Sequence, residues 1–308
     1  MQNDLHMTDT HVDDQNDDQN EDRVRQVHHV EHNNDHQPTT NPDNLPKRRR
    51  SMSLKIPVVV YDKISIRELD LNMIRPNTES IKTNLGGTKL TVIGKPGSGK
   101  SFLIKSLLAS KQHIIPVGMV ISGSEDTNRF YQSMFPNAFI FENFKMSHIE
   151  SIQKRQKYAM TNLPNPWAVL IMDDCMDDVK IFNDPKMIGL MKNSRHWSLL
   201  TIISTQYCLD FKPVIRTNID GVFIFRESNL TNREKLYRNF ASIIPTYNLF
   251  EMLMNEITTD FNCLYIHNQS TSNNWQDCCF YYKAPRIDDF KFGCDEFWKF
   301  SDTRCSTI

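Results

Sequence analysis

Residues 90–101 read LTVIGKPGSGKS, and this stretch determines how the rest of the chain is interpreted. Residues 90–93 form a short apolar run with β-branched side chains, which is typical of a buried strand. The residues that follow fit the pattern G-x-x-x-x-G-K-[S/T] of a phosphate-binding loop, and SFLIKSLLAS after it reads as a helix. Strand, loop and helix in this order predict a nucleotide-binding site.

The residue types in the loop suit a triphosphate and Mg²⁺. Glycines let backbone N–H groups approach the phosphates closely, and the start of the next helix favours negative charge. Lys100 supplies a cation for the β- and γ-phosphates, and Ser101 supplies a hydroxyl for Mg²⁺. The expected phosphate-binding residues are Gly94, Lys95, Pro96, Gly97, Ser98, Gly99, Lys100 and Ser101.

A second strand ends in two acids, in the stretch VLIMDD at residues 169–174. In a parallel sheet these carboxylates lie at the carboxyl edge, beside the loop. Asp173 is expected to hold the Mg²⁺ through water or through Ser101, and Asp174 is the expected base that orients or deprotonates the attacking water. The alternative is a simple acidic turn, because Asp177 and Asp178 follow closely. The position after a phosphate-binding loop favours the catalytic interpretation.

Three more residues are candidates for catalysis. Gln206 follows the strand expected at 198–204, where a polar side chain can reach the γ-phosphate or the water. Arg195 and then Arg216 are candidates for a guanidinium that a neighbouring subunit inserts to neutralise developing charge. Either arginine could instead bind backbone carbonyls or nucleic acid.

Composition divides the chain of 308 residues into two parts. Residues 1–46 hold eleven Asp/Glu against two Arg, with six of the ten His. Such a segment is expected to be a disordered tail, so we place the tail at 1–50 and the nucleotide-binding domain at 51–308. The histidine spacing fits no defined metal site, and the basic run KRRR at 47–50 fits a nuclear-localisation or nucleic-acid patch as well as a solvated linker.

Without residues 1–46 the chain carries 34 Lys/Arg and 26 Asp/Glu, a net charge of +8, which suits a polyanionic partner. The seven scattered cysteines contain no C-x-x-C pair and favour reduced thiols over a disulfide framework or a zinc site. No signal peptide and no apolar run of about 18 residues is visible, so we expect no membrane span and no secretion.

Apolar strands alternate with helices, which indicates an α/β fold with a mostly parallel sheet covered on both faces. Strands are expected at 56–61, 90–93, 117–122, 138–141, 167–172, 198–204, 221–226, 263–267 and 279–283, the last two as a hairpin. Helices are expected at 101–111, 126–135, 146–162, 185–195, 231–242 and 245–258. Ser147 and Glu150 predict a capping box for the helix at 146–162. A short helix is expected within 65–76, helical or irregular structure at 288–300, and fraying at 301–308.

Several of these segments together resemble the poxvirus-type genome-packaging ATPases of nucleocytoplasmic large DNA viruses, within the FtsK–HerA superfamily of P-loop NTPases. They are GKPGSGKS, VLIMDD, SRHWSLLTIISTQ, KPVIRTNIDGVFIF and FKFGCDEFWKF, and the resemblance covers about residues 54–300. It implies a RecA-like domain that binds ATP and Mg²⁺ and hydrolyses ATP. It further implies a homo-oligomeric ring that moves double-stranded DNA, without reading its sequence, into a capsid with a capsid or portal protein. Asp174 stands where the superfamily more often has glutamate.

The implied location is the virion and the host-cell cytoplasm or nucleus. Two other functions stay open at this point. One is a helicase-type ATPase that moves single strands, and the other is a slow nucleotide-dependent switch in virion assembly. The guanine-reading motif N/T-K-x-D is absent from the sequence, which argues against a GTPase.

Overall fold

The computed structural model describes residues 65–83, 86–175, 179–207 and 211–305. All of them belong to the second of two units into which the chain divides, Met1–Val60 and Tyr61–Ile308. The domain boundary expected at residue 50 and the strand expected at 56–61 lie outside the described residues and stay predictions. The described strands are β1 Arg67–Glu68, β2 Lys89–Ile93, β3 Val117–Ser122, β4 Ile140–Phe141, β5 Ala168–Asp173, β6 Leu199–Thr205, β7 Gly221–Ile224, β8 Asn262–His267 and β9 Cys279–Lys283.

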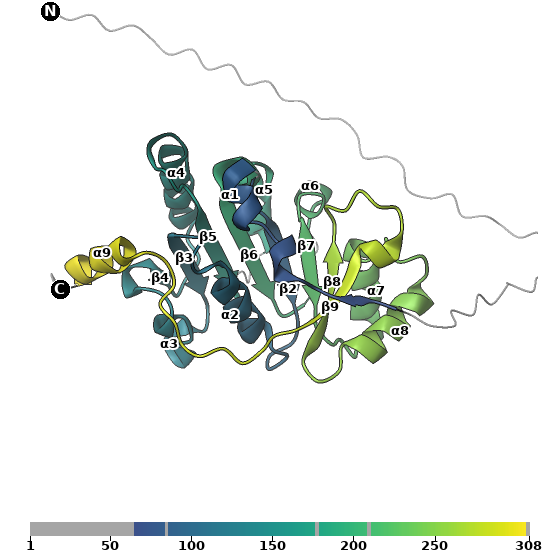
Figure 1. Ribbon diagram of the computed structural model, residues 1–308. Helices are drawn as coiled ribbons and strands as arrows, with labels where there is room; N and C mark the ends of the chain where they lie inside the picture. The colour runs from purple at the N-terminus through teal and green to yellow at the C-terminus, as the bar shows by residue number, and fades with distance from the viewer. Residues whose placement is uncertain (1–64, 84–85, 176–178, 208–210, 306–308) are drawn as a thin grey trace, which may run out of the picture. The chain divides into compact units, whose positions relative to one another are not determined.

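These strands form one mixed sheet in the order β1-β9-β8-β7-β2-β6-β5-β3-β4 (Figure 1). The strand before the loop, β2, lies inside the sheet and pairs in parallel with β6 on one side and β7 on the other. Among the described strands only β8 is antiparallel to its neighbours, β7 and β9. The expected P-loop NTPase fold with a mostly parallel sheet is therefore confirmed, and so is the terminal hairpin.

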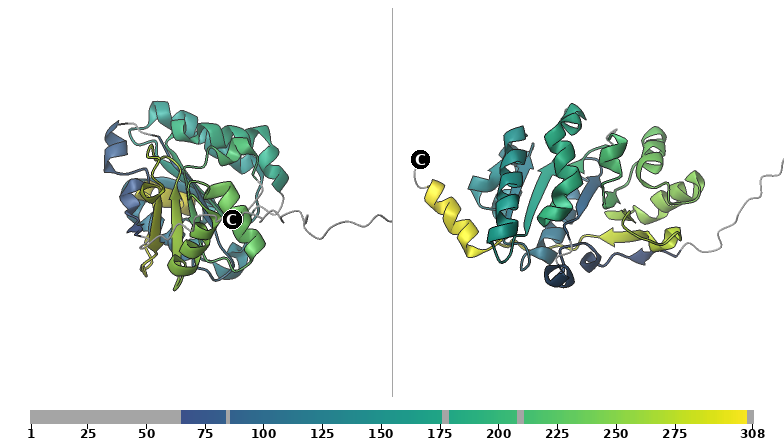
Figure 2. Two further views of the ribbon diagram at one scale, coloured as in Figure 1. Left: turned by 90° about the vertical axis from the view of Figure 1, so that its right-hand side faces the viewer. Right: turned by 90° about the horizontal axis from the view of Figure 1, so that it is seen from above.

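Helices cover both faces of the sheet (Figures 1 and 2). The described helices are α1 Thr78–Thr83, α2 Lys100–Lys111, α3 Glu125–Asn128, α4 Met146–Asn162, α5 Pro185–Asn193, α6 Pro213–Arg216, α7 Leu230–Phe240, α8 Tyr247–Ile257 and α9 Asp295–Cys305. One core joins the sheet to α4, α5, α7 and α8, and the other joins it to α2 and α9. Side chains of β5 alternate between the two cores, which explains why this strand is an uninterrupted apolar run.

A long C-terminal strap, residues 284–305, runs from β9 to the part of the sheet that contains β3 and β4. It leaves β9, passes α2 where Asp289 binds Lys105 at 2.6 Å, and ends in α9 (Figure 1). There the Phe292 N–H donates to the Met134 carbonyl at 2.9 Å, and the Phe292 and Phe135 rings stack at 4.9 Å. The strap therefore packs against the region of β3 and β4.

The expected helix at 146–162 is confirmed, but its capping box is wrong. α4 begins at Met146, its N-cap is Lys145, and no side chain caps it. Glu150, the expected partner of Ser147, instead forms an ion pair with Lys186 of α5. The packing of α4 against α5 thus uses the carboxylate that the capping box required.

Three other segments differ from expectation. Residues 65–76 hold β1 and a 3₁₀ turn, not an α-helix, and α1 begins after Pro76. The helix expected at 126–135 stops at Asn128, because Arg129 adopts a left-handed φ of 49°. The strand at 138–141 shrinks to β4, since a 3₁₀ turn occupies Asn137–Phe139.

The segment 288–300, expected to be helical or irregular, is irregular up to residue 294 and helical from Asp295, where α9 begins. The fraying expected from residue 301 is wrong for residues 301–305, which belong to α9. Ser301 is buried, and its hydroxyl accepts a hydrogen bond from the Ala138 N–H at 3.2 Å. In the part of the chain that the structure describes, no helix has the length and apolar character needed to cross a bilayer.

Candidate nucleotide site

The phosphate-binding loop lies at the carboxyl edge of β2, between the ends of β6 and β7. The Gly94 N–H donates to the Thr205 carbonyl at 3.1 Å, and the Phe225 N–H donates to the Ile93 carbonyl at 2.8 Å. α2 begins directly after Gly99. The first backbone hydrogen bond of this helix runs from the Leu103 N–H to the Gly99 carbonyl at 3.0 Å. The N–H groups of the first turn therefore remain for an anion, as at other helix N-termini.

The loop backbone requires its glycines. Gly97 and Gly99 have φ angles of 73° and 107°, which residues with a β-carbon rarely adopt. A β-carbon on Gly94 would lie 2.7 Å from the Phe225 β-carbon and 2.5 Å from Ser98 Oγ, which is too close. The Ser98 hydroxyl is buried and has no hydrogen-bond partner among the described residues. These features fit a phosphate cradle, and the concave backbone supplies the donors.

Lys100, Asp174 and Gln206 come together beside this cradle. The Lys100 ammonium donates to the Gly94 carbonyl at 2.8 Å and lies 3.2 Å from Asp174 Oδ2. The Gln206 amide nitrogen lies 3.5 Å from the same carboxylate oxygen. Burial raises the pKa of the Asp174 carboxyl, while the neighbouring Lys100 ammonium opposes that rise. The site thus holds a cation, a proton acceptor and an amide within reach of one another.

The sheet register explains this convergence. Asp173 of β5 pairs with Ser204 of β6, and the Asp174 N–H donates to the Ser204 carbonyl at 3.1 Å. Asp174 then turns with a left-handed φ of 44°, a conformation that aspartate adopts more readily than most residues. The strand end and this turn bring Asp174 beside Lys100.

Asp173 is buried and faces the same core as α2. Its carboxylate accepts a hydrogen bond from the buried Tyr131 hydroxyl at 2.8 Å. Burial raises the pKa of the Tyr131 hydroxyl well above its usual value, and the Asp173 charge adds to the rise, so the hydroxyl stays a donor. The sheet neighbours Ser122 and Ser204 flank Asp173 with buried hydroxyls that have no partner among the described residues.

A second acid, Glu125, holds Tyr131 in place. Its carboxylate accepts hydrogen bonds from the N–H groups of Tyr131 at 3.0 Å and Gln132 at 2.9 Å. Burial raises the pKa of the Glu125 carboxyl, although these two donors oppose the rise. We did not expect Tyr131 or Glu125 from the sequence. The signal lies in the strand order, because both follow β3, which is the direct neighbour of β5.

The expected magnesium residues, Ser101 and Asp173, belong to the start of α2 and the end of β5. No group of three or more His, Cys, Asp or Glu side chains that could bind a metal occurs among the described residues. A magnesium ion here would depend on phosphate oxygens and water for its remaining ligands, as in other nucleotide sites. The carboxylate and the unpartnered serine hydroxyls around it are oxygen donors of the kind that Mg²⁺ prefers.

Two other loop residues point to different roles. The Lys95 ammonium forms an ion pair with Glu227 at 2.8 Å and donates to Ser228 Oγ at 3.1 Å. Pro96 is exposed. The Lys95 side chain therefore binds the segment after β7, and only its backbone is part of the expected phosphate cradle.

The two candidate arginines lie at the opposite edge of the sheet from the loop. Arg195 precedes β6 and Arg216 precedes β7, whereas the loop follows β2, which is parallel to both strands. Arg195 forms an ion pair with Asp220, which also binds the buried Lys89 at 3.0 Å at the start of β2. Arg216 ends α6, before β7, and donates to the Asn239 side chain. The structure does not bring either arginine to its own loop, and their role at a neighbouring subunit stays a prediction.

A third arginine, which we did not expect, follows β7 at the carboxyl edge. Arg226 is exposed and lines a cavity together with Ser98 of the loop. Its position as the last residue of the strand expected at 221–226 was the available signal.

Known proteins similar to this chain come from large DNA viruses. Uncharacterized protein 088R of Invertebrate iridescent virus 3 is 52% identical over 239 residues, which cover 76% of this chain and 92% of that protein. Uncharacterized protein 015R of Frog virus 3 is 46% identical over 244 residues, which cover 78% of this chain and 76% of that protein. No protein-family model matches the chain.

Among solved structures, the chain is similar to B204, the DNA-packaging ATPase from Sulfolobus Turreted Icosahedral Virus. The match has a TM-score of 0.49 and 16% identity, and it covers 64% of this chain and 97% of B204.

Proposed function

The chain belongs to the family of large-DNA-virus proteins that includes 088R of Invertebrate iridescent virus 3 and 015R of Frog virus 3. We propose that it is an ATPase that moves double-stranded viral DNA into the capsid. The observation that carries the proposal is the meeting of Lys100, Asp174 and Gln206 at the end of a glycine-rich loop. Resemblance to the genome-packaging group supplies the DNA substrate.

The residues divide the work as follows. Loop N–H groups and the start of α2 bind the phosphates, and the Lys100 ammonium moves from Asp174 to a phosphate oxygen. Asp174, released from Lys100, accepts the proton of the attacking water, and Gln206 orients that water. Asp173 and Ser101 hold Mg²⁺, which neutralises charge on the phosphates when it is bound.

The proposed partners are further copies of this chain, double-stranded DNA and a capsid or portal protein. A homo-oligomeric ring places an arginine, Arg195 or Arg216, at the next subunit's nucleotide. A net charge of +8 outside residues 1–46 suits a sequence-independent grip on the DNA backbone. The ring acts with a capsid or portal protein at the viral assembly site, in the virion and in the host-cell cytoplasm or nucleus.

The test is ATP hydrolysis by the purified full-length chain, alone, with duplex DNA and with single strands of the same length. We expect duplex DNA to stimulate turnover severalfold and more than single strands do, and we expect added salt to weaken the effect. Equal or stronger stimulation by single strands would indicate a helicase. Slow turnover that no DNA changes would indicate an assembly switch.

Tyr131→Phe is expected to raise the Mg²⁺ concentration needed for half-maximal hydrolysis by about 10-fold. The reason is the loss of the hydrogen bond that orients Asp173, since partners that orient a metal ligand typically change metal affinity by about 10- to 100-fold. The measurement is hydrolysis against MgCl₂ at saturating ATP. Tyr282→Phe is the matched control, because it removes a buried tyrosine hydroxyl that bonds Ser106 at 2.6 Å, away from the site. An unchanged Mg²⁺ requirement in Tyr131→Phe would remove Tyr131 from the site.

A further inference from the structure

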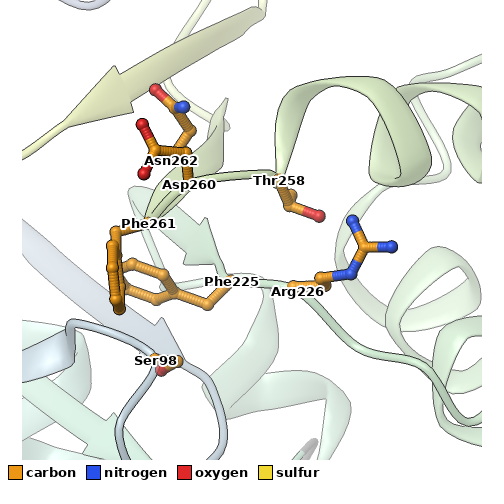
Figure 3. Close-up of a pocket in the computed structure, with 7 residues that line it drawn as sticks. All are labelled: Ser98, Phe225, Arg226, Thr258, Asp260, Phe261 and Asn262. Atoms are coloured by element: carbon orange, nitrogen blue, oxygen red, sulfur yellow. The ribbon is translucent and has the colours of Figure 1, made fainter.

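A cavity of about 260 Å³ opens beside the phosphate-binding loop. Its wall combines Ser98 of the loop, Phe225 and Arg226 at the end of β7, and Asp260 and Phe261 before β8 (Figure 3). The volume is below the roughly 300–1,000 Å³ of pockets that enclose a whole small molecule. It suits one part of a ligand whose remainder lies in the loop.

Two aromatic rings meet in this cavity (Figure 3). Phe225 is 3% exposed, whereas Phe261 is 62% exposed. A β-carbon added to Gly99 would lie 3.3 Å from Phe225 Cε1 and 3.7 Å from Phe261 Cδ1. Both rings therefore lie against the last loop residue before α2.

The backbone holds Phe261 in an uncommon conformation. Asp260 and Phe261 have consecutive left-handed φ angles of 51° and 62°, which are rare for residues other than glycine, asparagine and aspartate. An exposed phenylalanine in such a turn loses the benefit of burying its ring. Exposed strained positions of this kind cluster at ligand sites.

The sheet order shows which part of a nucleotide would reach this cavity. Asp173 ends β5 and Asp174 follows it, and β5 is separated from β2 by β6 alone. The cavity lies on the other side of β2, at the ends of β7 and the start of β8. If the terminal phosphate of a nucleotide contacts Lys100 beside Asp174, its sugar and base therefore lie on the opposite side of the loop, toward β7.

We propose that this cavity binds the base of the nucleotide, with the exposed ring of Phe261 as the stacking platform and Phe225 as the floor. The ring faces of a heterocyclic base and of phenylalanine stack favourably whatever the base, so this contact adds affinity without reading the base. The assignment rests on the proposed nucleotide site and adds the position of the base to it.

The test compares a ligand that has a base with one that lacks it. Binding of ATP and of inorganic tripolyphosphate, both with Mg²⁺, is measured by calorimetry for the full-length chain, for Phe261→Ala and for Phe261→Tyr. We expect Phe261→Ala to weaken ATP binding about 10-fold and to leave tripolyphosphate binding unchanged, and we expect Phe261→Tyr to bind ATP like the wild type. Tyr158→Ala is the control, since Tyr158 is an equally exposed aromatic residue, 63% exposed, on α4.

Three results would overturn the assignment. Unchanged ATP binding in Phe261→Ala would show that the ring does not contact the base. An equal loss for both ligands would show that Phe261 acts on the loop itself. If the wild-type chain binds tripolyphosphate as tightly as ATP, the base pocket fails and the phosphate site stands, whereas binding of neither ligand would overturn the proposed function.

Discussion

Lys100→Ala is expected to weaken ATP binding by about 100-fold or more and to abolish hydrolysis. The Lys100 ammonium is buried, its side chain is 7% exposed, and it is the loop's cation between the Gly94 carbonyl and Asp174. Removal of one member of a buried, hydrogen-bonded charge pair costs about 2–5 kcal/mol, which corresponds to this loss. The measurement is equilibrium binding of ATP with Mg²⁺, followed by turnover at saturating ATP.

Lys105→Ala is the matched control for this variant. Lys105 is buried on the same helix, but its ammonium binds Asp289 at the surface, outside the site. We expect this variant to bind ATP like the wild type, with thermal unfolding used to check the fold of both variants. Retention of normal ATP affinity by a folded Lys100→Ala protein would contradict the phosphate site.

Asp174→Asn is expected to separate binding from chemistry. Asparagine keeps the size of the side chain and removes the charge that holds Lys100 when no nucleotide is present, so ATP binding should be retained or become tighter. Asparagine cannot accept the proton of the water, and a lost general base typically lowers turnover by about 10²- to 10⁴-fold. The measurements are ATP affinity and single-turnover hydrolysis.

Asp126→Asn provides the control, because Asp126 is an exposed aspartate on α3 whose side chain accepts a hydrogen bond from Thr127. It should hydrolyse ATP at the wild-type rate. If Asp174→Asn is equally active, Asp174 is not the base. In that case Glu125, a buried acid whose carboxylate binds the Tyr131 N–H beside Asp173, becomes the next residue to replace.

The carboxyl-edge residues were predictable because each follows its own strand. Lys100, Asp174 and Gln206 come after three apolar runs that the sequence marks clearly, and parallel strands bring such ends to one edge. The distance along the chain between them therefore did not matter. The order of the strands could not be predicted from the sequence. The role of Tyr131 depends on that order, because the Tyr131 hydroxyl reaches Asp173 only when β3 lies beside β5.

Predictions from local sequence patterns were wrong where a side chain binds another element of the fold instead of its neighbours in sequence. Glu150 was a reasonable capping residue for α4, but it pairs with Lys186 of another helix. Phe261 gave no signal at all, since a phenylalanine in a turn after a helix is unremarkable until the fold brings it to the loop. The two candidate arginines raise a further difficulty, because their contacts within one chain, with Asp220 and with Asn239, do not test a role at the next subunit.

The C-terminal strap has a consequence for how the protein matures. A nascent chain that has reached Lys283 already contains all nine described strands, yet the contacts of Phe292 with Met134 and Phe135 do not exist. These contacts join residues far apart in sequence, and such distant pairings form slowly. Folding on the ribosome therefore cannot be completed until residues 284–305 have emerged from the exit tunnel, and translation that stalls before this point leaves the aromatic surface around Phe135 open to aggregation.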